Sequence, residues 1–337
     1  MSNRTIARAF AAFVIALVIV GGAAAQKADY RVSEPYSYKN LTIFLLHGKD
    51  QNIKGNTMTL QEAMERKLFV VYETSEVNEL EVENLSKEFD VFIQSGDIVK
   101  GGKQDRVLAV SIIIPARSGR VKIEAFCVES GRWTKRGIED SAKFDSSNDR
   151  IVTKDMKIAA NATRSQQDVW ASVSEVQGQL SKNVGGAVAS DKSESSLQLS
   201  LENKKVVATV DEYIKNLSGI VAGKSDVIGF AMAINGKINS ADVYVSNALF
   251  KKVWLKMLKA SATEAVAESK GVRLADPVKA SAVTEMIQDS ERARSREQSL
   301  GSGKTRLVTR EDKDNIMTEA RDEKTNVVVH KSYVKKD

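Results

Sequence analysis

The most constraining feature of this sequence is a pair of apolar segments joined by Asn235-Gly236. Segments 227–234 and 238–245 flank this dipeptide, which favours a type I′ hairpin because both turn positions need a positive φ. The first segment is apolar on both faces, so we expect it inside a sheet rather than at an edge. A helix packed on this hairpin is predicted by the apolar residues Phe250, Val253, Trp254, Met257 and Leu258.

The segments before residue 135 predict a β-rich half. Thr59 and Glu62 have the spacing of a capping box, which predicts a short helix through Lys67. Strands are predicted at 41–46, 68–72, 80–85, 91–94, 107–114 and 121–128, where apolar and β-branched residues cluster between turn signals.

The spacing of apolar residues changes in the middle and at the end of the chain. Helical spacing predicts helices over 166–181 and 205–217, separated by a Gly/Ser-rich loop over 183–202. After a charged, helix-like run over 289–298, three short β segments are predicted at 307–310, 316–320 and 327–333. The fold class is therefore α+β, with a β-rich N-terminal half and with central and C-terminal helices packed on a hairpin-containing sheet.

Residues 1–25 have the features of a cleavable secretory signal peptide. Arg4 and Arg8 precede an apolar run over 10–20, and Ala23 and Ala25 fit the small-residue rule for cleavage. The run is shorter than the about 20 apolar residues that a membrane anchor needs. We therefore expect export to a periplasm or the extracellular space, with no membrane span after cleavage.

Composition disfavours several kinds of site. Removing the two signal-peptide arginines lowers the net charge from +6 to +4, and the remaining charges of both signs are interspersed, which argues against nucleic acid as a partner. Cys127 is the single cysteine, so no internal disulfide is expected. With only His47 and His330 as histidines, no metal site and no cofactor are predicted.

The stretch from Gly96 to Arg106 is dense in glycine and charge and is expected to form a loop between two strands. Adjacent glycines allow backbone N–H groups to converge on an anion, and basic side chains would add positive charge. Two acidic residues could orient those cations, bind a cation or act as an acid/base pair. The alternative is a solvated turn whose charges pair with each other. The residues concerned are Asp97, Lys100, Gly101, Gly102, Lys103, Gln104, Asp105 and Arg106.

Two further candidate sites lie at and just after the predicted strand that contains Cys127. Cys127 and His47 could form a nucleophile and its base, but Cys127 shares an apolar strand face, which is typical of a buried thiol. The cluster Glu129 to Trp133 places Arg132 beside a tryptophan, which suits a planar or anionic ligand, although a tryptophan at a strand end also covers a core.

The segment from Gly301 to Thr305 resembles the end of a phosphate-binding loop. Gln298 occupies the position where the motif needs its first glycine, and no strand is predicted before it. A flexible connector explains this segment better.

The runs GDIVKGGKQDRVL (96–108) and AFCVESGRW (125–133), with the hairpin and helix of 228–254, resemble the ARG and rhodanese-phosphatase-superfamily-associated protein domain. The resemblance covers about 36–333 and implies one domain unit, with a β-rich part over 36–135, a helix and hairpin part over 165–270, and C-terminal β segments over 304–333. The family name points by association to ADP-ribose or phosphoester chemistry and supplies no catalytic residues. The matching motifs would place a site at Asp97, Lys100, Gln104, Asp105 and Arg106, with Glu129 and Arg132 nearby.

Three hypotheses for function follow. The first is a binding or interaction module that holds a small anionic or polar ligand through loop 96–106. The second is a hydrolase for a phosphorylated or ADP-ribosyl-like substrate, with Asp97 or Asp105 as the acid/base group. The third is an envelope-associated scaffold in which the loop is an ordinary turn. The sequence leaves the identity of any protein partner unknown.

Overall fold

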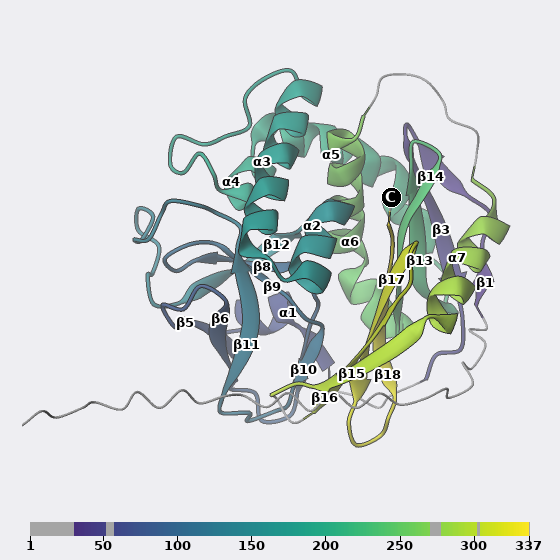
Figure 1. The fold of residues 1–337 in the computed structure, drawn as a ribbon, viewed down its shortest axis with the longest axis horizontal. Helices are drawn as coiled ribbons and strands as arrows, with labels where there is room; N and C mark the ends of the chain where they lie inside the picture. The colour runs from purple at the N-terminus through teal and green to yellow at the C-terminus, as the bar shows by residue number, and fades with distance from the viewer. Residues whose placement is uncertain (1–29, 52–56, 270–277, 302–303, 337) are drawn as a thin grey trace, which may run out of the picture.

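The computed structural model describes residues 30–51, 57–269, 278–301 and 304–336 (Figure 1). The predicted signal peptide at 1–25 and residues 302–303 of the phosphate-loop-like segment lie outside these ranges. The fold is α+β, with a β-rich N-terminal region, central helices and C-terminal antiparallel strands, as the sequence predicts.

A nine-stranded antiparallel sheet forms one side of the molecule. Strand β13 (Val227–Ile234) is buried at every position and lies between β3 (Leu41–His47) and β14 (Lys237–Tyr244), which confirms the prediction of an interior strand. Asn235 and Gly236 join β13 to β14 with φ of 51° and 75°, as a type I′ turn requires. Outward from β14 follow β18 (Val328–Lys335), β17 (Asn315–Asp322), β16 (Thr305–Glu311) and β15 (Arg294–Ser299), whereas β1 (Arg31–Val32) and β2 (Tyr36–Tyr38) both pair with β3.

Two smaller sheets build the N-terminal part. The first has the order β10 (Ile112–Ile114), β7 (Asp90–Ile93) and β4 (Thr57–Thr59). The second has the order β12 (Phe144–Arg150), β8 (Asp97–Gly101), β9 (Arg106–Leu108), β11 (Arg120–Cys127), β6 (Glu79–Asn84) and β5 (Phe69–Glu73).

Two helices cover opposite faces of the nine-stranded sheet (Figure 1). The predicted helix α6 (Asn247–Ala267) packs Trp254 on Phe230, with the ring centroids 5.5 Å apart. On the other face, α7 (Ala280–Arg292) packs Met286 and Ile287 into a second apolar cluster. The alternation of side chains along β13 and β14 separates the two clusters, because successive residues point to opposite faces.

The remaining helices precede α6 in the chain. The capping box of Thr59 and Glu62 is present and begins α1 (Leu60–Glu65). The others are α2 (Lys154–Ile158), which runs into a π-helical turn η1 (Ala159–Thr163), α3 (Gln166–Asn183), α4 (Leu197–Leu201), α5 (Lys204–Leu217) and the 3₁₀ turn η2 (Ser218–Val221).

Three local predictions are wrong. Segment 107–114 is two strands in different sheets: β9 ends at Leu108 in the six-stranded sheet, and β10 begins at Ile112 in the three-stranded sheet. Between them Ser111 contacts His330 in the interior. The predicted loop 183–202 contains α4, which begins with a Ser196 cap. The run 289–298 is helical only to Arg292 and continues as β15. The C-terminal part of the sheet therefore has four strands instead of the three predicted. Its charged residues suit this outermost, exposed edge strand.

Candidate functional site

The predicted loop 96–106 is largely a β-hairpin, formed by β8 and β9. Gly101 and Gly102 have φ of 113° and 55°, so glycine is needed there as expected. Their amides, however, do not converge on an open anion nest. Gly101 N–H donates to Asp105 Oδ1 at 2.9 Å, and Gly102 N–H donates to the carbonyl of Asp140 at 3.1 Å. This corrects the expectation of a free phosphate-cradling loop.

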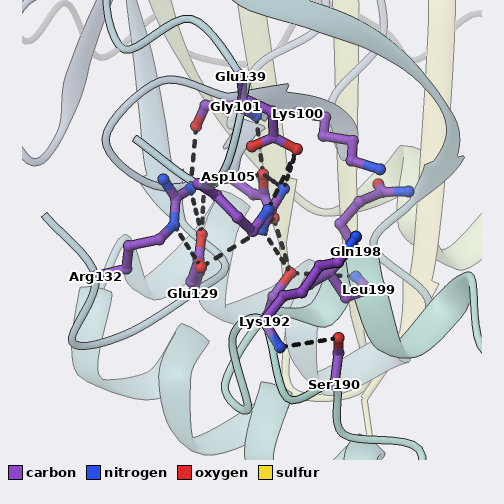
Figure 2. Close-up of polar contacts among 12 residues, drawn as sticks. Lys100, Gly101, Asp105, Glu129, Arg132, Glu139, Ser190, Lys192, Gln198 and Leu199 are labelled. Atoms are coloured by element: carbon purple, nitrogen blue, oxygen red, sulfur yellow. Dashed lines mark hydrogen bonds and ion pairs between the residues drawn. The ribbon is translucent and has the colours of Figure 1, made fainter. Parts of the chain in front are cut away.

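Asp105 lies at the centre of a buried carboxylate–arginine cluster, which we define as Asp105, Glu129, Arg132, Arg136 and Glu139 (Figure 2). Asp105 is fully buried and accepts hydrogen bonds from both Nη atoms of Arg136, at 2.8 and 2.9 Å. Its Oδ2 also accepts from the Ser196 hydroxyl at 2.8 Å. The hairpin, the loop after β11 and the start of α4 are thereby tied together.

Glu129 is the second carboxylate of the cluster and is also fully buried. It accepts from the backbone N–H of Asp105 at 3.0 Å and from Arg132 at 2.7 and 2.6 Å. Arg132 also donates to the carbonyls of Gly101 and Gly102. The family motifs 96–108 and 125–133 therefore do meet in space, through contacts that hold the hairpin and the loop together.

Arg136 is held as a cation by its partners in the cluster. Burial alone would lower the pKa of Arg136, but hydrogen bonds and charges from Asp105 and Glu139 raise it above its ordinary value. Two buried carboxylates with paired guanidinium groups are arranged as a structural network rather than as an acid/base pair facing a ligand.

Arg106 belongs to a neighbouring buried group. Its guanidinium has no exposed surface, lies 3.2 Å from Glu73 and donates to Cys127 Sγ at 2.9 Å. Burial raises the pKa of Cys127 to about 11, although Arg106 acts in the opposite direction. The thiol is therefore protonated at neutral pH, as expected of a buried core cysteine. Among the described residues, His47 is not one of the hydrogen-bond partners of this thiol, which are Arg106 and the carbonyl of Val77. His47 ends β3, and its Nδ1 lies 2.9 Å from Asp226.

The remaining predicted residues lie outside the cluster. Lys100 points away from it (Figure 2) and pairs with Glu202 at 2.7 Å. Gln104 is buried, with 4% of its surface exposed. Asp97 lies at the far end of β8, where its Oδ1 is 3.0 Å from Lys256 and 3.5 Å from Arg150.

Asp97 is one end of a buried polar layer that the sequence did not reveal. The layer also contains Ser111, His330 and Asp242, which come from three distant segments. Ser111 Oγ lies 3.0 Å from His330 Nδ1, and Asp242 Oδ1 lies 2.9 Å from His330 Nε2. Gln94 bridges the two ends, because its side chain contacts Tyr244 and His330 and its backbone N–H donates to Asp97.

The carboxylates of this layer are ionised. Burial alone would raise the pKa of Asp242, but His330, Arg150 and Lys157 together lower it below its ordinary value. The pKa of Asp97 is likewise lowered by Lys256 and Arg150 against the effect of burial. Neither carboxylate is therefore set up to deliver a proton at neutral pH.

The Ser111–His330–Asp242 series differs from a hydrolytic triad in two respects. In such triads the serine faces Nε2 of the histidine and the aspartate faces Nδ1, whereas here the two nitrogens are exchanged. Ser111 is also only 4% exposed, and its Oγ already accepts the backbone N–H of Ser95. The series therefore joins β18 and β14 to the N-terminal part rather than presenting a nucleophile.

A polar cleft of about 560 Å³ lies between α2, α3, the β13–β14 turn and the end of α6. Charged and amide side chains dominate its lining, among them Asp155, Glu175, Gln179, Lys182, Asn183, Asn235, Lys237 and Asn239. Asn239 is 4% exposed and donates from Nδ2 to Glu264 at 2.8 Å, while its Oδ1 has no hydrogen-bond partner among the described residues. No sequence pattern indicated this cleft.

Comparison with known protein families matches residues 29–334 to the ARG and Rhodanese-Phosphatase-superfamily-associated Protein domain. The chain belongs to this family. A search of curated proteins and a search of solved structures returned no match.

The family domain thus contains the carboxylate–arginine cluster, the polar layer and the polar cleft. Of the helices in the described ranges, none combines the length and apolar character that a bilayer crossing requires. Those ranges also hold no group of three or more His, Cys, Asp or Glu side chains suited to a metal ion.

Proposed function

We propose that this family member is a binding module for a small polar ligand that carries an anionic group, and that the polar cleft holds it. The observation that carries the proposal is the lining of the cleft, in which basic, acidic and amide side chains from four elements surround a volume of about 560 Å³. Such a lining offers hydrogen-bond donors and acceptors together with charges of both signs, which suits a small polar ligand.

The charges of the cleft narrow the class of ligand. Lys182 and Lys237 line it and make no ion pair with any described residue, so both are available to an anionic group. Asp155 and Glu175 lie on the same lining and would accept from hydroxyl or amino groups. The volume falls within the about 300–1,000 Å³ typical of small-molecule sites. Phosphorylated polyols and acidic amino compounds fit this pattern.

The hairpin 96–106 is not the part of the molecule that we assign to binding. Its glycine amides, Asp105 and Arg106 already have partners inside the protein. The hydrolase alternative gains no support from Asp105, which is fully paired, or from Asp97, whose pKa is lowered. The scaffold alternative predicts that the cleft binds nothing.

A thermal-shift screen of the chain from Gln26 against phosphorylated sugars, nucleotides and acidic amino compounds tests the proposal. A ligand at about 100 times its dissociation constant adds about 2.7 kcal/mol to stability. For a domain of about 300 residues this raises the Tm by about 4 °C.

Matched variants connect any hit to the cleft. Lys182→Ala and Lys237→Ala remove cationic groups of the cleft, and Lys251→Ala removes an exposed lysine of α6 that does not line it. We expect the first two to weaken binding at least about tenfold, since a charge-assisted contact contributes about 1.5–3 kcal/mol, and the third to leave it unchanged. A hit that all three variants retain would place the ligand elsewhere, and a flat screen would favour the scaffold.

We further propose that the protein acts outside the cytoplasm, which rests on the predicted signal peptide. Mass spectrometry of the chain recovered from the extracytoplasmic fraction should find Gln26 as its first residue. Retention of an intact Met1-containing chain in the cytoplasm would contradict this proposal.

A further inference from the structure

A small group of exposed apolar side chains surrounds Arg106. Trp133 is 41% exposed, whereas Trp254 is buried and Trp170 is partly buried. The guanidinium of Arg106 lies 5.6 Å from the centroid of the Trp133 ring, and Lys103 Nζ lies 5.3 Å from it. Arg106 also donates to the carbonyl of Val77, which is 42% exposed, so Val77 and Trp133 flank the same buried guanidinium.

The loop that carries Trp133 is fixed rather than loose. Arg132 and Arg136, on either side of it, insert into the carboxylate–arginine cluster through contacts of 2.6–2.9 Å. The same loop presents Ile138 with its side chain fully exposed. A loop anchored by buried ion pairs therefore holds large apolar side chains in solvent, where they contribute nothing to the core.

We propose that this surface, the Trp133 patch (Val77, Lys103, Trp133, Lys135 and Ile138), docks the protein onto an anionic phospholipid surface. This goes beyond the proposed ligand cleft and does not depend on it. Trp is the side chain that concentrates where a bilayer meets water. Lys103 beside its ring, with the exposed Lys135 and Lys143 of the same loop, supplies positive charge for anionic headgroups and outnumbers the exposed carboxylates Glu76 and Asp140 of these segments.

The size of the patch favours a lipid surface over a protein partner. A standard protein interface covers about 800 Å² on each side and is built around several apolar anchors. Among the described residues the exposed large hydrophobic side chains are only Val77, Leu85, Trp133, Ile138 and Leu255, of which three lie in the patch. A few protruding side chains beside lysines suit shallow insertion between headgroups.

Co-sedimentation with phosphatidylcholine vesicles, with and without phosphatidylglycerol, tests the proposal. We expect the chain from Gln26 to bind only the vesicles that contain phosphatidylglycerol, with a blue shift of tryptophan emission. Trp133 should account for that shift because it is the most exposed of the three tryptophans. Trp133→Ala and Ile138→Ser should each reduce the partition coefficient at least about tenfold, and Lys103→Gln about fivefold.

Leu255→Ser is the matched control, since Leu255 is 55% exposed on α6, outside the patch. It should bind vesicles like the wild type. The proposal is overturned if the wild type fails to bind anionic vesicles, or if Trp133→Ala binds them equally well. Concentration-dependent dimerisation of the wild type that Trp133→Ala abolishes, seen by analytical ultracentrifugation without vesicles, would assign the patch to a second copy instead.

Discussion

Replacing Asp105 by Asn tests whether the carboxylate–arginine cluster is structural. The fully buried carboxylate accepts hydrogen bonds from both Nη atoms of Arg136, from the Ser196 hydroxyl and from the Gly101 amide. Asn keeps the shape, but it removes the negative charge and turns an amide N–H₂ group toward donors. Removing one partner of a buried ion pair destabilises a protein by about 3–5 kcal/mol.

The expected loss of unfolding free energy can be expressed as a change in melting temperature. At about 2.1 cal/mol/K per residue, a domain of about 300 residues loses about 1.6 °C for each kcal/mol. Asp105→Asn should therefore lower the Tm by about 5–8 °C and lower the urea midpoint without changing the slope of the transition. The control is Asp140→Asn, an exposed residue whose Oδ1 accepts one amide, with an expected effect below about 0.5 kcal/mol.

Two outcomes would refute this reasoning. Equal stability of Asp105→Asn and Asp140→Asn would mean that the buried network contributes no net stability. A stable Asp105→Asn variant that had lost a hydrolytic activity of the wild type would show that the carboxylate serves chemistry, as the hydrolase alternative requires.

Three further predictions concern single sites. Gly102→Ala should destabilise by about 2–4 kcal/mol, because its Cβ would lie 2.3 Å from an aromatic ring at a positive φ. Gly137→Ala, also at a positive φ but with no atom within 4 Å, should cost about 1 kcal/mol in the same urea titration. Cys127, with a pKa of about 11, should be about one-thousandth ionised at pH 8, so a thiol reagent should label it only in urea, and rapid labelling of the folded protein would contradict its burial. Asp97 and Asp242 have lowered pKa values in the fold, so their stabilisation is present above the ordinary pKa of about 3.9 and is lost as pH falls through the folded values. The urea concentration at the unfolding midpoint should therefore decrease as the pH is lowered below about 5. If the midpoint of Asp242→Asn decreased by the same amount over this pH range, the Asp242 carboxylate would be excluded as a cause.

Local chemistry made part of this fold predictable. The Asn235-Gly236 turn and the Thr59 capping box were correct because their geometry depends on a few adjacent residues. The strand 227–234 was placed in the sheet interior because it is apolar on both faces. The approach of Glu129 to Asp105 was suggested only by the family motifs.

The rest depended on contacts between distant segments. Ser111, Asp242 and His330 carry no local pattern, yet they meet in the interior. The charges of hairpin 96–106 were predicted to lie near one another, but pairing with Arg136 could not be anticipated, because that residue lies in a loop without a periodic signal. The cleft around Asn239 forms only when four separate elements come together.

The strand order also has a consequence for how the chain acquires its structure. The first long strand, β3, pairs with β13, and β14 pairs with β18, whose last residue is Lys335. The largest sheet therefore cannot be completed until the chain has been synthesised as far as β18, and its pairings join very distant residues, which slows folding. A chain of this topology remains open to chaperones and to a translocation channel for longer than one whose early segments fold on their own. Late completion of the sheet would suit the export that we propose, in which the chain crosses a membrane before it folds.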